Sequence, residues 1–289
     1  MKLALGTVQF GLSYGVANQS GQVTQDEGRA MLQLAAINQI DTLDTAIAYG
    51  ESEQRLGEIG VSGWNIVSKL PAIPDDCNDV AKWIADAVEG SRQRLNVDSL
   101  YGMLLHRPQQ LMDKAGNDIY RALEQLKQDG VVQKIGVSIY EPSELNALCK
   151  YFQFDLVQAP FNILDRRLID TGWMTRLSEQ GTELHVRSVF LQGVLLMPEG
   201  KIPSKFNRWD SLWAKWYSWL EDVKLTPLQA CLCHALSFPE IDKVIVGVDN
   251  QNQLIEIIQA VKGVIPDVPD ELKSDDLDLI NPARWTALS

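Results

Sequence analysis

The stretch Lys243-Val244-Ile245-Val246-Gly247-Val248 is apolar on both alternating faces, as expected of a strand buried in a parallel sheet. Seven similar short runs precede it, at Leu3–Gly6, Ile40–Leu43, Trp64–Leu70, Ser99–His106, Lys134–Ser138, Leu156–Ala159 and Leu184–Val189. Longer segments with helical periodicity lie between these runs. Eight strand–helix units of about 36 residues each predict a (β/α)8 TIM barrel of the α/β class.

The intervening segments predict helices, several with start signals. We expect helices at Asp26–Ile37, Glu53–Gly60, Val80–Leu95, Asp118–Lys127, Glu141–Tyr151, Thr226–Ser237 and Gln251–Val261. Thr24 and Glu27 have the spacing of a capping box, and Thr226-Pro227 places an N-cap before a first-turn proline. An open doubly wound sheet is the alternative, but its G-x-G-x-x-G motif is absent from the sequence. We therefore expect residues 1–289 to form a single barrel domain.

The composition disfavours several kinds of partner. Hydrophobic residues make up 45% of the chain and charged residues 22%, which is typical of a globular protein. With 26 Lys and Arg against 38 Asp and Glu, the net charge of −12 disfavours nucleic acids and anionic membranes. No apolar run approaches the ~20 residues of a membrane span, and the first residues do not form a signal peptide. These features predict a cytoplasmic protein, either a monomer or a small homo-oligomer.

The cysteines and two of the histidines predict no metal site. Four cysteines (Cys77, Cys149, Cys231 and Cys233) are scattered along the chain and do not suggest a disulfide framework. On a helix, Cys231 and Cys233 diverge, and no second pair of ligands follows them. His185 and His234 lie apart from the other polar groups at strand ends, so we interpret both as structural.

Polar side chains recur where the predicted strands end, which in a barrel is the catalytic rim. Asp44 ends the second strand, with Tyr49 shortly after it, Lys69 ends the third and His106 the fourth. An acid, a phenol, an ammonium and an imidazole are thus expected together. Lys69 would stabilise the phenolate of Tyr49, whose ordinary pKa is near 10, and Asp44 would hold Lys69. With His106 bonding the same oxygen, the group suits reduction of a carbonyl by a nicotinamide hydride.

These residues resemble the aldo-keto reductase family. The matching pieces follow the family's order: Leu5-Gly6-Thr7, Asp44-Thr45-Ala46 with Tyr49-Gly50, Ser68-Lys69, Leu104-Leu105-His106-Arg107-Pro108, Gly136-Val137-Ser138, Val157-Gln158 with Phe161-Asn162, and Ile245-Val246-Gly247-Val248. The resemblance implies a barrel that binds NADP(H) or NAD(H), a tetrad of Asp44, Tyr49, Lys69 and His106, and Tyr49 as proton donor to an aldehyde or ketone. The segment from Gly6 to Ala17-Asn18 is similar to a bacterial branch of mostly unassigned substrates, for which a sugar-derived carbonyl compound is an analogy.

The resemblance also implies the residues that contact the cofactor. They are Gly6, Thr7, Ser138, Gln158, Arg187, Ser188, Gly247, Asp249, Asn250 and Gln253. Ser138 and Gln158 match the positions that hold the nicotinamide carboxamide, whereas Ile139 replaces an asparagine that is common there. Arg187 replaces an aromatic residue that usually stacks under the nicotinamide. Its guanidinium can stack on a ring, but its charge disfavours the oxidised nicotinamide.

Asp249 occupies a position where the family commonly has Ser, Thr, Lys or Arg to hold the 2′-phosphate of NADPH. A carboxylate repels a phosphate and can accept hydrogen bonds from a free ribose 2′-hydroxyl. We therefore expect NADH to bind as well as or better than NADPH.

Two other functions use the same residues. Lys69 at a strand end could form a Schiff base, as in barrel aldolases and lyases. A non-catalytic nicotinamide-binding regulatory protein could use the same scaffold, and the departures at Ile139, Arg187 and Asp249 keep this alternative open.

The C-terminal third of the sequence has aromatic and acidic features. A helical stripe of Trp209, Trp213, Trp216 and Trp219 is interpreted as core packing, with a wall of the substrate pocket as the alternative. The acidic segment Asp267–Asp278 is expected to be a solvated helix or an end cap. Arg284-Trp285 is a candidate border of the pocket.

Overall fold

In the computed structural model, eight parallel strands form a closed barrel in sequence order, with β8 paired to β1. The structure describes residues 1–16, 18, 21–264 and 266–288, so Ala17 lies outside the described residues. The strands are β1 Leu3–Gly6, β2 Thr42–Asp44, β3 Asn65–Leu70, β4 Leu100–Leu105, β5 Val132–Ser138, β6 Leu156–Pro160, β7 Glu183–Arg187 and β8 Lys243–Gly247. The predicted (β/α)8 barrel is confirmed.

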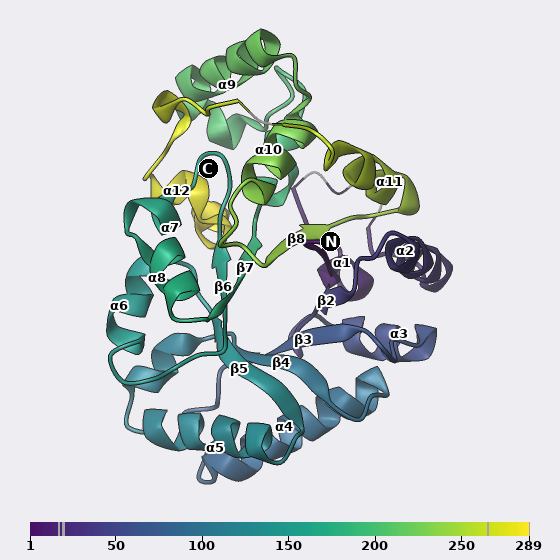
Figure 1. Cartoon of the computed structure of the whole chain (residues 1–289), viewed down its shortest axis with the longest axis vertical. Helices are drawn as coiled ribbons and strands as arrows, with labels where there is room; N and C mark the ends of the chain where they lie inside the picture. Colours follow the sequence, from purple (N-terminus) through teal and green to yellow (C-terminus); the bar gives the residue numbers. More distant parts are fainter. Residues whose placement is uncertain (17, 19–20, 265, 289) are drawn as a thin grey trace.

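Helices surround the strands as an outer layer (Figure 1). They are α1 Val8–Gly11, α2 Gln25–Ile37, α3 Ser52–Ile59, α4 Val80–Leu95, α5 Gly116–Gln128, α6 Leu145–Leu148, α7 Arg167–Asp170, α8 Trp173–Glu179, α9 Asp210–Val223, α10 Pro227–Leu236, α11 Gln251–Ala260 and α12 Leu277–Ile280. Because helices cover the outside and side chains fill the inside, the strands are buried on both faces. This burial accounts for the near-continuous apolar runs in the sequence.

The expected boundaries hold within two residues for every strand and for most helices. Thr24 caps α2 as predicted, but the Glu27 carboxylate accepts a hydrogen bond from the backbone of Gln251 at the start of α11. The helix expected at Glu141–Tyr151 is shorter than predicted. A 3-10 turn over Pro142–Glu144 precedes α6, because the Glu144 side chain accepts the backbone N–H groups of Tyr140 and Glu141 and tightens the first turn.

The tryptophan stripe is part of the core, which confirms that interpretation. Trp213, Trp216 and Trp219 of α9 are buried, and the rings of Trp216 and Trp219 stack with centroids 5.7 Å apart. Figure 1 shows α9 beside the yellow C-terminal segment, outside the helix ring. Trp209 donates to Asp276 Oδ2 at 3.1 Å, which attaches this segment to the start of α9.

The C-terminal segment is therefore an end cap built from short turns. Its elements are η5 Asp270–Leu272, α12 and η6 Pro282–Ala287. Trp285 is buried, with its ring edge-to-face against Phe206 at 4.8 Å. Arg208 binds both Asp276 and Asp278, at 2.6 and 3.3 Å, so the acidic segment is paired with a cation.

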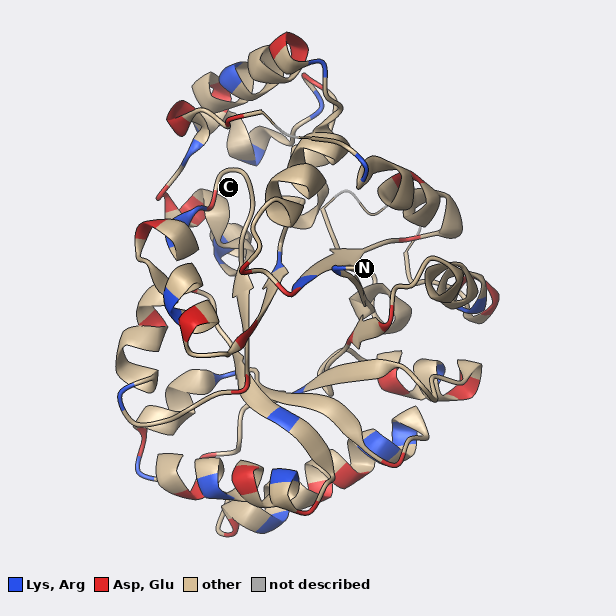
Figure 2. Ribbon diagram, in the orientation of Figure 1, with Lys and Arg blue, Asp and Glu red and all other residues tan. Residues whose placement is uncertain are grey.

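Charged residues lie mainly on the outer helices and loops, while few lie on the strands (Figure 2). Within the described residues, no helix has the length and apolar character required to cross a membrane.

Candidate active site

The centre of the site is an ion pair inside the barrel. Lys69 of β3 is fully buried, and its Nζ donates to Asp44 Oδ1 and to the carbonyl oxygen of Thr45, both at 2.7 Å. Burial lowers the pKa of the Lys69 ammonium, but the charge and hydrogen bond of Asp44 and the charge of Tyr49 together outweigh this effect, so the pKa is raised above its ordinary value. Lys69 is therefore held in its protonated form.

Tyr49 lies beside this ion pair, on the loop between β2 and α3. Lys69 Nζ is 5.0 Å from the centroid of the Tyr49 ring. The loop packs tightly against α1 at Gly11. A Cβ atom at Gly11 would lie only 1.7 Å from the carbonyl oxygen of Tyr49, so no larger residue fits there. Gly50 has a φ of +57°, which a residue with a side chain rarely adopts. Two glycines thus permit the turn that carries Tyr49.

The start of α3 anchors the same loop from the other side. Ser52 is fully buried, and its hydroxyl donates to the carbonyl oxygen of Thr7 at 2.9 Å. The Ser52 hydroxyl also lies 3.0 Å from the Thr7 hydroxyl and 3.1 Å from the Thr45 hydroxyl. Thr7, expected to contact the cofactor, is fully buried and donates its hydroxyl to the carbonyl oxygen of Asp44 at 3.0 Å.

His106 follows β4 and faces Tyr49. The two ring centroids are 6.0 Å apart and the planes are inclined by 79°. Burial, together with the charges of Lys69 and Arg187, lowers the pKa of His106 to about 4. The imidazole is therefore neutral at pH 7 and can donate one hydrogen bond. All four members of the predicted tetrad lie at the carboxyl ends of β2, β3 and β4.

A hydrogen-bonded chain connects the ion pair to the ends of β5 and β6. Gln158 Nε2 donates to Asp44 Oδ1 at 2.6 Å, and Ser138 donates its hydroxyl to Gln158 Oε1 at 3.2 Å. Both residues are buried. The sequence analysis predicts that Ser138 and Gln158 contact the cofactor, but it did not predict the contact between Gln158 and the Asp44 carboxylate.

Arg187 lies at the end of β7 and leans across the rim toward β5. Its guanidinium donates to the carbonyl oxygen of Ile139 at 2.9 Å and to the Ser188 hydroxyl at 3.2 Å. Its Cζ lies 5.0 Å from the centroid of the Tyr140 ring, and Arg107 approaches the same ring to 6.0 Å. Arg187, Ser188, Arg107 and Tyr140 therefore form one wall of the site.

Tyr14 is a further site residue that the sequence analysis did not find. It lies on the loop after α1, and its hydroxyl accepts a hydrogen bond from Gln192 Nε2 at 2.9 Å. Burial and the neighbouring Tyr49 raise the pKa of the Tyr14 hydroxyl, whereas the charge of Arg187 lowers it. Tyr14 and Tyr140 each lie shortly beyond a strand, so a search extended past the strand ends would have included both.

The predicted adenosine end is built around Asp249, after β8. Asp249 Oδ1 accepts from Asn18 Nδ2 at 3.0 Å, and Gln253 accepts from the backbone N–H of Asp249 at 2.8 Å. Burial raises the pKa of the Asp249 carboxyl. Asn250 caps α11 by accepting from the backbone N–H of Gln253 at 3.0 Å. The structure thus groups these three residues at the start of α11.

Gly6 and Gly247 lie side by side at the ends of β1 and β8. The Gln9 amide lies over Gly247, since a Cβ there would be 2.8 Å from Gln9 Nε2. Gln9 Oε1 is a buried oxygen with no hydrogen-bond partner in the described part of the chain. An acceptor of this kind beside two glycines is suited to a donor group on a ligand.

The predicted structural histidines are buried. His185 is fully buried in β7, with Nε2 3.3 Å from Glu183 Oε1. His234 stacks on Phe161 with centroids 5.2 Å apart, and burial lowers its pKa to about 3. Among the described residues, no group of three His, Cys, Asp or Glu side chains could hold a metal.

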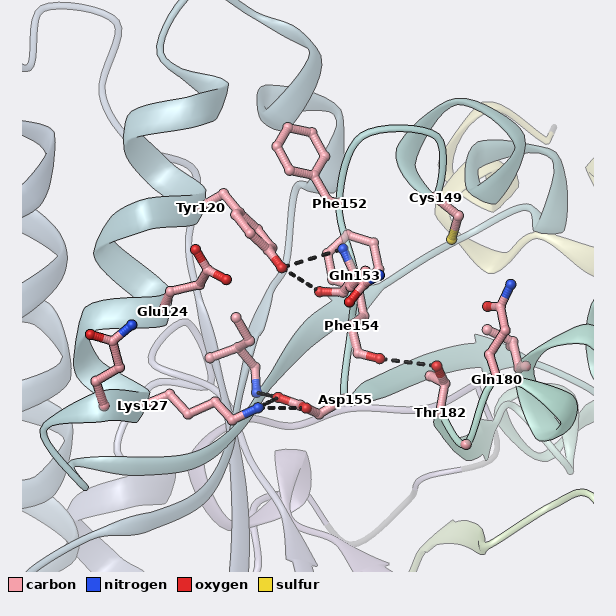
Figure 3. Close-up of a pocket in the computed structure, with 14 residues that line it drawn as sticks. Tyr120, Glu124, Lys127, Cys149, Phe152, Gln153, Phe154, Asp155, Gln180 and Thr182 are labelled. Atoms are coloured by element: carbon pink, nitrogen blue, oxygen red, sulfur yellow. Dashed lines mark hydrogen bonds and ion pairs between the residues drawn. The ribbon is translucent and has the colours of Figure 1, made fainter.

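A separate hollow of about 690 Å³ lies near the amino-terminal ends of β5, β6 and β7, away from the tetrad (Figure 3). Its polar groups bond to one another: Lys127 binds both carboxylate oxygens of Asp155, at 2.6 and 2.7 Å, and Tyr120 donates to the carbonyl oxygen of Gln153. In a barrel this end supports stability rather than chemistry.

Comparison with known proteins shows which family the chain resembles. The family model of the aldo/keto reductase family matches residues 2–269. The chain is 25% identical over 219 residues to "Oxidoreductase sirO" of Leptosphaeria maculans, covering 72% of this chain and 65% of that protein. It is 25% identical over 251 residues to "D-threo-aldose 1-dehydrogenase" of Pseudomonas sp, covering 73% and 75%.

A solved structure shows the same fold. The aldo-keto reductase AKR11C1 from Bacillus halodurans, in its holo form, aligns with a TM-score of 0.72 at 21% identity and covers 94% of this chain and 89% of its own. The family match spans nearly the whole barrel, including all eight strands. The chain therefore belongs to the aldo/keto reductase family.

Proposed function

We propose that the protein reduces the carbonyl group of an aldehyde or ketone with a nicotinamide cofactor, with Tyr49 as the proton donor. The observation that carries this proposal is the fully buried Lys69 ammonium, held by Asp44 and placed 5.0 Å from the Tyr49 ring, with His106 opposite. A phenol beside a fixed cation and a neutral imidazole suits protonation of an oxygen that is gaining negative charge.

Each residue has one task in this reaction. The neutral His106 imidazole donates a hydrogen bond to the carbonyl oxygen and orients it toward Tyr49. When the C=O π bond breaks, that oxygen takes the hydroxyl proton of Tyr49. The Lys69 ammonium stabilises the phenolate that remains, and Asp44 keeps the ammonium charged. A proton from solvent restores the phenol.

The residues present fit a nicotinamide. A carboxamide has one acceptor and two donors, and the hydroxyl of Ser138 with the amide of Gln158 complements it. At the predicted adenosine end, Gln9 Oε1 offers a buried acceptor next to Gly247 for another part of the cofactor. When bound, the nicotinamide supplies the hydride for the carbonyl carbon.

The state of Lys69 favours this proposal over a Schiff-base aldolase or lyase. A nucleophilic lysine must be deprotonated, which usually requires a lowered pKa. In this barrel the pKa of Lys69 is raised, and two acceptors at 2.7 Å hold the ammonium. A non-catalytic nicotinamide-binding protein is distinguished from the reductase by the following experiment.

We expect Tyr49→Phe to lower kcat for reduction of a panel of aldehydes by about 100-fold or more, because the proton donor is lost. Binding of NADPH and NADH, measured by fluorescence titration, should stay close to that of the wild type. Tyr151→Phe is the matched control, since Tyr151 is 71% exposed. Equal turnover by Tyr49→Phe and the wild type would contradict the proposal.

We also propose that NADH binds as well as or better than NADPH. Asp249 supports this, because its carboxylate would repel a 2′-phosphate and can accept hydrogen bonds from a free hydroxyl. Asp249→Ser should raise the affinity for NADPH about tenfold, since a repulsion of about 1.4 kcal/mol is removed. Asp222→Ser, at an exposed position of α9, is the control. No gain in NADPH affinity would count against the proposal.

A further inference from the structure

The wall formed by Arg187, Arg107 and Tyr140 contains two cations that lack an acidic partner. Most described arginines form an ion pair with a carboxylate within 4 Å, for example Arg94 with Glu53 and Arg167 with Asp165. Within the described residues, Arg29, Arg107, Arg176 and Arg187 form no such pair, although acidic residues outnumber basic ones 38 to 26. Of these four, Arg107 and Arg187 approach the same aromatic ring beside His106, and Arg107 is exposed while Arg187 is half-buried.

The structure fixes the place of Arg187. Two of its five N–H donors are used by the carbonyl oxygen of Ile139 and by the Ser188 hydroxyl, and its Cζ lies 5.0 Å from the centroid of the Tyr140 ring. Within the described residues, its other donors make no hydrogen bond and can bind a ligand. These contacts hold the guanidinium in one orientation, so little side-chain freedom is lost when it binds.

Arg107 approaches the same Tyr140 ring and directly follows the catalytic His106. Both guanidinium carbons lie within 6.0 Å of the ring centroid, and both charges lower the pKa of His106. The two cations are therefore close to the point where the carbonyl group would react. Paired guanidiniums are the usual partners of carboxylates and phosphates, which they bind through two parallel hydrogen bonds.

We propose that Arg107 and Arg187 bind an anionic group, a carboxylate or a phosphate, on the carbonyl substrate. This inference rests on the proposed reductase function and adds a substrate class to it. The protein then prefers aldehydes or ketones that carry a negative charge beyond the carbonyl group. Arg187, which the sequence assigned to the nicotinamide, becomes a residue that determines substrate specificity.

The test compares charged and neutral substrates of the same shape. The ratio of kcat/KM for 4-formylbenzoate to kcat/KM for 4-nitrobenzaldehyde is measured in the wild type, Arg107→Gln and Arg187→Gln. The pair D-glyceraldehyde 3-phosphate and D-glyceraldehyde distinguishes a phosphate from a carboxylate. We expect each variant to lower the ratio for at least one pair by about 10- to 100-fold, the effect of losing a charged hydrogen bond.

The matched control is Arg176→Gln. Arg176 also stacks on an aromatic ring, 5.3 Å from the centroid of Trp173, but lies on α8, outside the wall. The substitution Arg176→Gln should leave the kcat/KM ratios of both substrate pairs unchanged. The alternative partner of Arg187 is a phosphate of the cofactor, which titrations with NADPH and NADH test. The proposal would be overturned if Arg187→Gln raised the Kd of the cofactor as much as it lowered activity while both substrate ratios stayed unchanged.

A binding measurement separates this inference from the reductase function. Calorimetric titration with the product 4-(hydroxymethyl)benzoate, and with benzyl alcohol as its neutral counterpart, needs no turnover. Tighter binding of the anion, lost in Arg107→Gln and Arg187→Gln, supports the inference even if the protein reduces nothing. If the wild type binds both alcohols equally, the inference is wrong even if the protein reduces aldehydes.

Discussion

The chemistry proposed for this protein depends on Lys69. A lysine inside a barrel usually loses its proton, because burial disfavours the charge. Asp44 prevents this by direct contact at 2.7 Å, and Gln158 fixes Asp44 through the same oxygen. Lys69 and Asp44 are therefore held by contacts that exist before any ligand binds, which is the condition for electrostatic preorganisation.

His106 provides a pH-dependent prediction at this scale. Its pKa is about 4 in the folded protein and near 6.5 in an unfolded chain, so the unfolded state takes up the proton first as the pH falls. This group therefore lowers stability progressively from pH 6.5 to pH 4, and has no such effect above pH 7. An NMR titration should give a midpoint near 4 for the resonance that is missing from His106→Gln.

Arg187→Gln is the companion variant for that titration. Because the charge of Arg187 lowers the pKa of His106, its removal should move the midpoint upward. A wild-type midpoint near 6.5 would contradict the lowering of the pKa by burial and by Arg187, and a midpoint above 7 would contradict the neutral imidazole that the mechanism requires.

The tetrad could be predicted from the sequence because strand ends converge on one rim of a barrel. Asp44, Lys69 and His106 each lie at or next to the end of an apolar run. Their proximity in the fold could therefore be predicted without knowing the paths of the loops. Tyr14 and Tyr140, and the contact of Arg107 with the Tyr140 ring, lie beyond the strand ends and so fall outside this criterion. Their positions depend on the paths of loops, which have no periodicity that a sequence pattern could report.

At the scale of elements, α3 links the Tyr49 loop to the strand that carries Lys69, two residues of the proposed site. Glu53 follows Tyr49 by four residues and is buried, and its Oε1 accepts from Ser68 and Ser91, both at 2.6 Å. Arg94 of α4 binds Glu53 Oε2 through two donors, at 2.9 and 2.7 Å. Because Ser68 precedes Lys69 on β3, one carboxylate connects the Tyr49 loop to the lysine strand.

Glu53→Gln should therefore destabilise the protein and misplace Tyr49. We expect a loss of about 2–4 kcal/mol in urea unfolding, since a buried carboxylate that accepts from Ser68 and Ser91 and pairs with the partly exposed Arg94 loses its charge. Glu51→Gln is the control: the Glu51 side chain is 65% exposed and pairs with Arg55 at the surface, so its loss should cost less than about 1 kcal/mol. Equal effects of the two substitutions would show that the Glu53 cluster does not anchor α3.

The strands and most helices followed from periodicity, because burial on one or both faces leaves a regular apolar pattern. Periodicity did not predict the structure of segment 141–151 correctly. The Glu144 side chain accepts hydrogen bonds from two backbone N–H groups there, and this tightens the first turn. The cap formed by η5, α12 and η6 was predicted only as an acidic helix or end cap. Its turns are set by contacts with Phe206, Arg208 and Trp209, which are distant in the sequence.

At the scale of the whole molecule, the end cap extends the barrel beyond the 2–269 family match. The buried Trp285 joins it to Phe206, and its indole N–H donates to the carbonyl oxygen of Leu279 at 3.0 Å. Trp285→Ala should cost about 3–5 kcal/mol, whereas Tyr151→Ala at an exposed site should cost less than about 0.5 kcal/mol.

Thermal unfolding also tests whether residues 1–289 form one domain. We expect the far-UV circular dichroism and the tryptophan fluorescence of the wild type to change in a single coincident transition, and Trp285→Ala to shift both together. Two separated transitions would mean that the cap or another segment unfolds independently of the barrel.

The most direct test of the oxidoreductase assignment is a pair of binding titrations of the purified protein, one with NADPH and one with NADH. We predict saturable binding of at least one, with NADH binding as tightly as or more tightly than NADPH. Binding of neither would leave Tyr49, Lys69 and His106 without a source of hydride and would contradict the proposed function.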